Sequence, residues 1–142
     1  MPTLLPKPLL RRAALLVFCA VMAVCASAES GKLFGRFSGT ILCADCSGIL
    51  LELTLYSHPA VYQLKQTYEG TRDGAKTFTE KGTWLIRRGS AKNPHATIYE
   101  LDPAGSDSKQ FYLRANKDTL RLLDRQKQEL PPQLPHTLRL VK

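Results

Sequence analysis

Two cysteines separated by two residues, Cys43 and Cys46, are the best candidates for chemistry in this sequence. In an oxidising compartment two neighbouring thiols form a disulfide, which here would pin the turn between the first two predicted strands. In the reduced state, two thiolates suit a soft ion such as Cu(I). Thiol–disulfide exchange fits less well, because such motifs begin a helix, whereas Ser47 and Gly48 lead into a predicted strand. The disulfide and the copper site both remain open from these residues alone.

Zinc would need more ligands than this pair provides. The three histidines, His58, His95 and His136, are the further candidates, but their spacing gives no reason to expect them beside the cysteines. The sequence contains no nucleophile elbow, HExxH motif, phosphate-binding loop or Gly-rich cofactor fingerprint. It is therefore predicted not to be an enzyme.

The first residues have the order of a secretory signal peptide. Lys7, Arg11 and Arg12 precede an apolar run over residues 13–24, and Ala26-Ser27-Ala28 provides a small-residue cleavage site. The apolar run is too short for the roughly 20 residues of a membrane-spanning helix, and no second such run follows. We therefore expect residues 1–28 to be cleaved and residues 29–142 to form a single exported domain.

Removal of residues 1–28 would take Cys19 and Cys25 with it and leave Cys43 and Cys46 as the remaining pair. Cys25 is also the candidate for a lipid anchor, but Val24 stands where a smaller residue is expected. A periplasmic protein without an anchor is the main expectation, and an outer-membrane lipoprotein is the alternative.

The charge of the chain argues against a nucleic-acid partner. The whole sequence has a net charge of +8, and residues 29–142 hold 17 basic and 12 acidic residues, a balance of +5. These basic residues are spread singly along the predicted strands instead of forming a run, which is typical of solvated strand faces.

Beyond the signal peptide, the sequence shows a period of two, typical of β-strands, and no sustained helical period. Leu51, Leu53 and Leu55 alternate with Glu52 and Thr54, for example. Turn-forming residues such as Ser57-His58-Pro59 separate the segments, and Gly82 inside one of them suggests a bulge or bend. The predicted strands are residues 33–41, 49–56, 61–68, 77–86, 96–101, 110–115, 119–124 and 136–141.

Eight short antiparallel strands in a domain of this size predict an all-β fold, as an up-and-down barrel or as a sandwich, which alternation alone cannot separate. Aromatic residues in these strands either fill the core or line a pocket for a small ligand. They are Tyr62, Tyr68, Phe78, Trp84, Tyr99, Phe111 and Tyr112.

Several motifs, taken together, resemble the amino-terminal domain of the NlpE family. They are Gly39, the string Leu42-Cys43-Ala44-Asp45-Cys46-Ser47-Gly48-Ile49, Leu53-Thr54-Leu55-Tyr56, Tyr62, Tyr68-Glu69-Gly70, Gly82-Thr83-Trp84 and Leu120-Arg121-Leu122-Leu123-Asp124. The resemblance covers nearly all of residues 29–142. It implies an eight-stranded, lipocalin-like barrel and favours the barrel over the sandwich.

The same resemblance implies a non-enzymatic envelope protein that takes part in copper homeostasis or in sensing envelope stress, with Cys43 and Cys46 as the positions of copper or redox contact. Two alternatives stay open: a lipocalin-like binder of a small apolar ligand, and an envelope interaction protein in which the cysteines only staple a loop. The expected partners are accordingly a copper ion, a small apolar molecule or other envelope proteins.

Overall fold

The computed structural model describes residues 31–105, 107 and 109–142. The predicted signal peptide, residues 1–28, and the candidate anchor at Cys25 lie outside the described residues. The strands are β1 (Lys32–Ile41), β2 (Gly48–Ser57), β3 (Val61–Glu69), β4 (Lys76–Arg88), β5 (Thr97–Leu101), β6 (Gln110–Asn116), β7 (Thr119–Leu123) and β8 (Thr137–Leu140). Each predicted strand is present, and its ends lie within two residues of the predicted ones.

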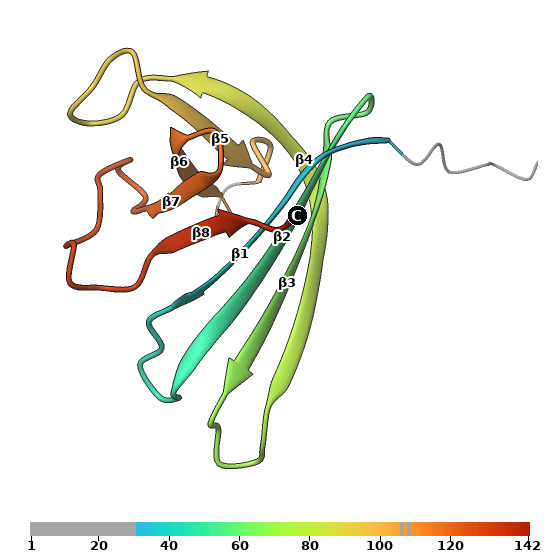
Figure 1. Cartoon of the computed structure of the whole chain (residues 1–142), viewed down its shortest axis with the longest axis vertical. Coiled ribbons are helices and arrows are strands. Elements are labelled where there is room, and N and C mark those ends of the chain that lie inside the picture. The colour runs from blue at the N-terminus through green and yellow to red at the C-terminus, as the bar shows by residue number, and fades with distance from the viewer. Residues whose placement is uncertain (1–30, 106, 108) are drawn as a thin grey trace, which may run out of the picture.

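The eight strands form a closed antiparallel barrel (Figure 1). Each strand pairs with the next one along the chain, and β8 returns to pair with β1. This arrangement confirms the predicted all-β fold and selects the barrel over the sandwich. Among the described residues, no helix is long and apolar enough to cross a membrane.

Strand β2 shows why the alternating pattern produces a barrel wall. Leu51, Leu53 and Leu55 are at most 1% exposed, whereas Glu52 and Thr54 between them are partly exposed. Because successive side chains of a strand point to opposite faces, the leucines line the interior and the polar residues meet solvent.

The interior is filled by side chains from all eight strands. Tyr112, which is fully buried, donates a hydrogen bond from its hydroxyl group to Gln110 Oε1 at 2.8 Å, so its polar atom is satisfied. The buried residues form one continuous cluster: Phe37, Leu51, Leu53, Leu55, Tyr62, Leu64, Trp84, Tyr99, Leu101, Tyr112, Leu120 and Leu138.

A second, smaller cluster lies on the outer face of β5, β6 and β7. It consists of Ile98, Phe111 and Leu123, with Leu113 packed against them. The loops before β5 and after β7 meet over this face, where Lys127 Nζ lies 5.7 Å from the centre of the Phe111 ring. These three strands are therefore covered on both faces, unlike β1–β4.

Glycine at position 82 does not mark a bulge, because the pairing of β3 with β4 is regular through Tyr62 and Gly82. A Cβ atom at Gly82 would lie 2.8 Å from the Tyr62 ring, so the glycine makes room for that ring. A bulge occurs in β1 instead, where the register shifts between Leu33 and Gly35. The bulged residue, Phe34, packs 5.0 Å from Trp84 between ring centres and covers one end of the core.

The barrel closes along a narrow seam between β1 and β8. Within the described residues, β8 pairs with β1 only at Phe37 and Ser38. A Cβ atom at Gly39 would lie 2.1 Å from the Thr137 carbonyl oxygen, so glycine is needed for the two strands to approach this closely.

Strands β1–β4 extend past β5–β8 at one end of the molecule, the lower end in Figure 1. We call this part the projecting sheet and define it as residues 40–41, 48–50, 66–69 and 76–81. The remainder, in which the strands enclose the main core, is called the closed half. The projecting sheet carries the β1–β2 turn, which contains both cysteines.

Candidate functional site

Cys43 and Cys46 form a disulfide in the turn between β1 and β2, with their Cα atoms 5.3 Å apart. The turn is held to the next hairpin, because Ser47 N–H donates a hydrogen bond to the Glu69 carbonyl oxygen at 2.8 Å. Gly70 has a φ of +66°, and a Cβ atom there would lie 1.9 Å from Ser47 Oγ. Glycine therefore allows the two turns to pack together at the tip of the projecting sheet.

The disulfide is accessible from solvent and borders an apolar cleft of about 300 Å³. Both cysteines are partly exposed, and Leu42 beside them is 59% exposed. The cleft is lined by Leu42, Cys43, Ala44, Asp45, Cys46, Ile49, Tyr68 and Thr71. A metal ion or a reductant can therefore approach the sulfur atoms without any change in the barrel.

The oxidation state determines what the pair can do chemically. A disulfide has no thiolate to offer a metal, whereas the reduced pair has two. Cys46 Sγ lies 3.4 Å from the Gly48 carbonyl oxygen. The disulfide sulfur carries no hydrogen, so this contact is not a hydrogen bond in the oxidised protein.

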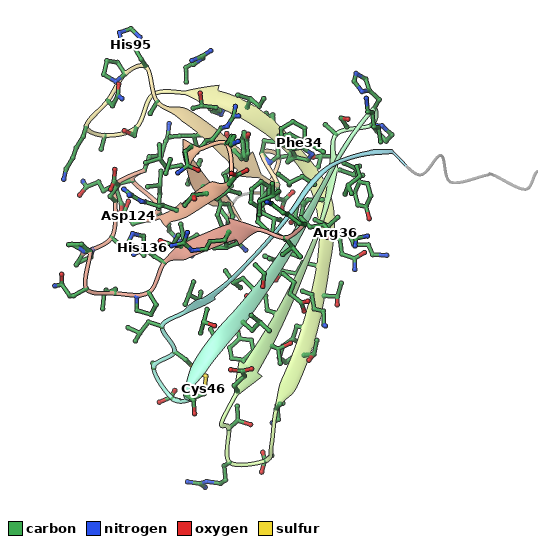
Figure 2. The ribbon with its side chains drawn as sticks, in the orientation of Figure 1. Phe34, Arg36, Cys46, His95, Asp124 and His136 are labelled. Atoms are coloured by element: carbon green, nitrogen blue, oxygen red, sulfur yellow. A yellow bond between two sulfur atoms is a disulfide. The ribbon has the colours of Figure 1, made fainter. Side chains whose placement is uncertain are left out.

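The three histidines do not join the cysteines. His58 is in the β2–β3 turn, and Figure 2 shows His95 and His136 well away from Cys46. His136 is 7% exposed, and its Nδ1 lies 2.5 Å from the Leu134 carbonyl oxygen. Among the described residues, no group of three or more His, Cys, Asp or Glu side chains could hold a metal ion. A four-ligand zinc site is thus not formed by this part of the chain.

The predicted aromatic set divides between the two parts of the molecule. Tyr68 and Phe78 lie in the projecting sheet, with ring centres 5.6 Å apart in an edge-to-face arrangement, and Phe78 is 55% exposed. The other members are buried and at most 8% exposed: Tyr62, Trp84, Tyr99, Phe111 and Tyr112. Core filling therefore accounts for most of the set, and only two rings are placed near the disulfide end.

Burial and acidic neighbours affect the tyrosines of the interior. Burial raises the pKa of Tyr62 above its usual value, and the negative charges of Glu80 and then Asp102 raise it further. The pKa of Tyr112 is raised strongly, mainly by burial and then by Glu80 and Tyr62. The interior hydroxyl groups thus stay protonated well into the alkaline range.

One buried charged residue was not anticipated from the sequence. Glu100 is 2% exposed on β5 and forms an ion pair with Arg87 on the neighbouring strand β4, and Lys109 Nζ lies 3.7 Å from its other oxygen. A glutamate between apolar residues of a predicted strand is the signal that could have identified it. Its carboxylate is balanced by the positive charges of Arg87 on β4 and Lys109 just before β6, so it links β5 to both of its neighbours.

Comparison with known proteins points to one family. The sequence profile described as the NlpE N-terminal domain matches residues 37–132, from within β1 to beyond β7, including both cysteines. Lipoprotein NlpE of Escherichia coli (strain K12) is 30% identical over 112 residues, which make up 79% of this chain and 43% of that protein. The chain thus spans less than half of that relative's length. No solved structure matches it significantly.

Proposed function

The chain belongs to the NlpE N-terminal domain family, and from this membership we propose that it is a non-enzymatic protein of the bacterial envelope that binds copper through Cys43 and Cys46. Its relative in Escherichia coli is a lipoprotein, which supports a location in the envelope. The copper role rests on the family resemblance and on the chemistry of the cysteine pair. Binding would serve copper homeostasis or the sensing of metal stress.

The observation that carries this proposal is the position of the two sulfur atoms. They lie side by side at the exposed tip of the projecting sheet, and the ends of β1 and β2 hold them there. Cu(I) accepts two thiolate ligands, whereas zinc requires a more complete set. The exposed carboxyl group of Asp45 adds negative charge between the two cysteines, which favours a cation.

Copper binding through this pair depends on reduction. The disulfide must take up two electrons before both sulfur atoms can act as thiolate ligands, so the oxidised protein is the inactive form for copper. The same site would then respond both to copper and to the redox state of the envelope. In the experiment below a phosphine supplies the two electrons and is itself oxidised to the phosphine oxide.

The test is a competition titration of Cu(I) against a chelator of known affinity. The protein reduced with a phosphine is expected to take one Cu(I) per chain, and the Cys43→Ser/Cys46→Ser variant is expected to take none. The oxidised protein, kept without reductant and titrated under nitrogen, is the matched control and is also expected to take none. Equal copper affinity in the reduced protein and the double variant would refute the proposal.

One alternative has a specific observation in its favour: the disulfide and the Ser47–Glu69 hydrogen bond together fasten two turns. Under this alternative the protein is an envelope interaction protein in which the disulfide is structural and stays oxidised. Trapping free thiols with an alkylating reagent in intact cells distinguishes the two. A fully oxidised pair under both copper-replete and copper-stressed conditions would favour the structural disulfide.

The interior gives less support to a lipocalin-like ligand site. The closed half is filled by its own aromatic and aliphatic side chains, including Tyr99, Tyr112 and Leu101, each at most 2% exposed. A small apolar molecule would have to displace these side chains, which lose close packing when they move. We therefore favour metal binding at the tip of the projecting sheet over ligand binding in the interior.

A further inference from the structure

The first half of β4, residues 76–81, is hydrogen-bonded to a neighbouring strand on one side only. β3 pairs with β4 along residues 76–83, whereas β5 pairs with it only along residues 84–88. Within the described part of the chain, no strand pairs with the other edge of residues 76–81. All of these residues are exposed. β4 therefore presents an open edge, at the outer side of the projecting sheet in Figure 1.

The hydrogen bonds at the end of this segment show which backbone groups point to the open edge. Trp84 N–H donates to the Ala60 carbonyl oxygen at 3.1 Å, on the β3 side, and Asp102 N–H donates to the Thr83 carbonyl oxygen at 2.8 Å, on the opposite side. Backbone groups of successive residues in a strand alternate between its two edges. The residues whose N–H and C=O groups point to the open edge are therefore Thr77, Thr79 and Lys81.

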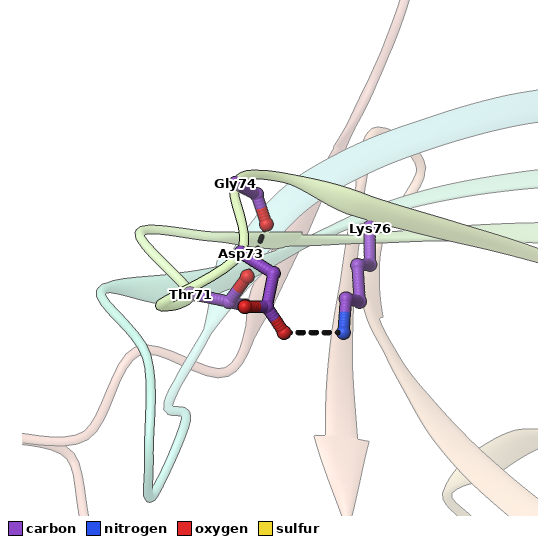
Figure 3. A network of polar contacts seen from close by, with 4 residues as sticks. All are labelled: Thr71, Asp73, Gly74 and Lys76. Atoms are coloured by element: carbon purple, nitrogen blue, oxygen red, sulfur yellow. Dashed lines mark hydrogen bonds and ion pairs between the residues drawn. The ribbon is translucent and has the colours of Figure 1, made fainter.

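The alternate residues of this segment place their side chains on the inner face of the projecting sheet. Lys76 Nζ lies 3.2 Å from Asp73 Oδ2 in the adjoining turn (Figure 3), and Glu80 Oε1 accepts a hydrogen bond from Gln66 Nε2 at 3.1 Å. Phe78 lies between them and is 55% exposed. A cation, an aromatic ring and an anion thus follow one another along the edge at every second residue.

We propose that a second copy of this chain pairs with the open edge of β4, antiparallel, about a two-fold axis at Phe78. In this register the two Phe78 rings face each other as a pair without backbone hydrogen bonds, in which side chains approach most closely. Thr77 of each copy exchanges backbone hydrogen bonds with Thr79 of the other. Lys76 of each copy faces Glu80 of the other, so both charges find an opposite partner.

The charge pattern favours a second copy of this chain as the partner, and it favours the register centred on Phe78. A shift of the axis to Thr79 would place Phe78 opposite Glu80, and a shift to Thr77 would place it opposite Lys76. Neither shift forms an ion pair or an aromatic pair. The segment from Lys76 to Glu80 is complementary to itself only when it is read antiparallel about Phe78, which is the requirement of a two-fold interface.

The same geometry limits the assembly to a dimer. Pairing joins the two projecting sheets into one continuous sheet and uses the open edge of both copies, so no equivalent edge remains for a third. The interface is small, and the exposed Lys76–Asp73 pair must exchange partners. The dimer is therefore expected to be weak and to dissociate on dilution.

The test is sedimentation velocity of residues 29–142, the expected exported domain, over about a hundredfold range of protein concentration. Lys76→Glu and Glu80→Lys each place like charges opposite each other twice per dimer and are expected to weaken self-association about tenfold. An equimolar mixture of the two variants restores every opposite pair between unlike chains. The mixture is therefore expected to form heterodimers with the affinity of the unmodified protein.

Lys81→Glu is the matched control, because it makes the same charge change on the same edge but leaves the facing pairs intact. It is expected to associate like the unmodified protein, and circular dichroism with thermal unfolding checks that all variants are folded. A monomer at every concentration of the unmodified protein would overturn the proposal. Self-association that the two charge variants leave unchanged, or a mixture that does not recover it, would overturn this register.

Discussion

The closed half and the projecting sheet share strands β1–β4, yet these strands are stabilised differently in the two parts. In the closed half their inner face is covered by β5–β8, and residues such as Leu53 and Leu64 are completely buried. In the projecting sheet the same strands extend past β5–β8, the outer edge of β4 is open, and Phe78 remains 55% exposed. Burial holds the first region together, whereas hydrogen bonding within the sheet and one disulfide hold the second.

Because of this difference, the residues that stabilise the fold and the residues of the candidate site lie in different parts of the molecule. The closed half bears nearly all of the main apolar core, so it sets the free energy of unfolding. The projecting sheet carries the cysteine pair and the open strand edge, which can change their chemistry or their partners at little cost to the fold. Changes of the same kind should therefore have unequal effects in the two regions.

The largest contrast is expected for a truncated leucine. Leu101→Ala in the closed half removes a side chain that is 0% exposed and should lower the free energy of unfolding by about 2–5 kcal/mol. Leu42→Ala at the tip, where the side chain is 59% exposed, should change it by less than about 0.5 kcal/mol. Urea denaturation followed by tryptophan fluorescence measures both. Equal losses would contradict the division into two regions.

The next contrast concerns ion pairs. Glu100→Ala leaves Arg87 and Lys109 without their buried carboxylate and should destabilise the protein by about 1–3 kcal/mol. Asp73→Ala, in the turn at the end of the projecting sheet, is the control, since its 3.2 Å pair with Lys76 is more than half exposed on both sides and should contribute less than about 1 kcal/mol. The same denaturation experiment applies, and a larger loss for Asp73→Ala would reverse the comparison.

Loss of the disulfide should have a smaller and more local effect. The Cys43→Ser/Cys46→Ser variant opens a very short loop, so the expected loss is about 2 kcal/mol or less. Amide hydrogen exchange should increase in the β1–β2 turn and at the start of β2, with little change in β5–β7. Faster exchange throughout the barrel would show that the tip also supports the closed half.

Alkaline pH should act on the closed half through Tyr112. Its folded-state pKa lies above the value of about 10 for an unfolded chain, so its contribution to stability is complete below pH 10 and is lost as the pH rises above 10. One such tyrosine lowers the free energy of unfolding by at most about 1.4 kcal/mol per pH unit. Tyr112→Phe should flatten this decline in denaturation curves recorded at several alkaline pH values, and an unchanged slope would count against it.

Most of the wall of the barrel could be predicted from the sequence. The strict alternation of residues 51–55 determines which face of β2 is buried, and turn residues such as Ser57-His58-Pro59 mark the strand ends. Alternation alone did not choose between barrel and sandwich, because both bury one face of every strand. The family resemblance supplied that choice.

Features that depend on the contacts between neighbouring strands could not be predicted from the sequence. Phe78 and Trp84 share one face of β4 in the sequence pattern. Only Trp84 lies in the part of β4 that pairs with β5, and only Trp84 is buried. Gly82 suggested a bulge or bend; the strand pairing there shows no bulge, and the glycine makes room for the Tyr62 ring across the strand pair. The bulge at Phe34 is followed directly by Gly35, so the glycine inside the predicted strand 33–41 was the signal that could have revealed it.

At the candidate site, the sequence identified Cys43 and Cys46 and left their state open, and the structure pairs them as a disulfide. The sequence spacing of His58, His95 and His136 gave no reason to place them nearby, and the described residues keep them apart from the cysteines. The apolar cleft beside the disulfide was not predicted, because it forms between the β1–β2 turn and the β3–β4 turn.

The seam between β1 and β8 determines how this barrel can move. With two paired positions, it is the shortest ladder between neighbouring strands among the described residues, whereas β1 and β2 are paired along nearly their whole length. Because so few paired positions hold these two strands together, we expect local opening of the barrel to include separation of β1 from β8 at this seam. Phe37 and Leu138 would be the first core side chains to meet water during such an event.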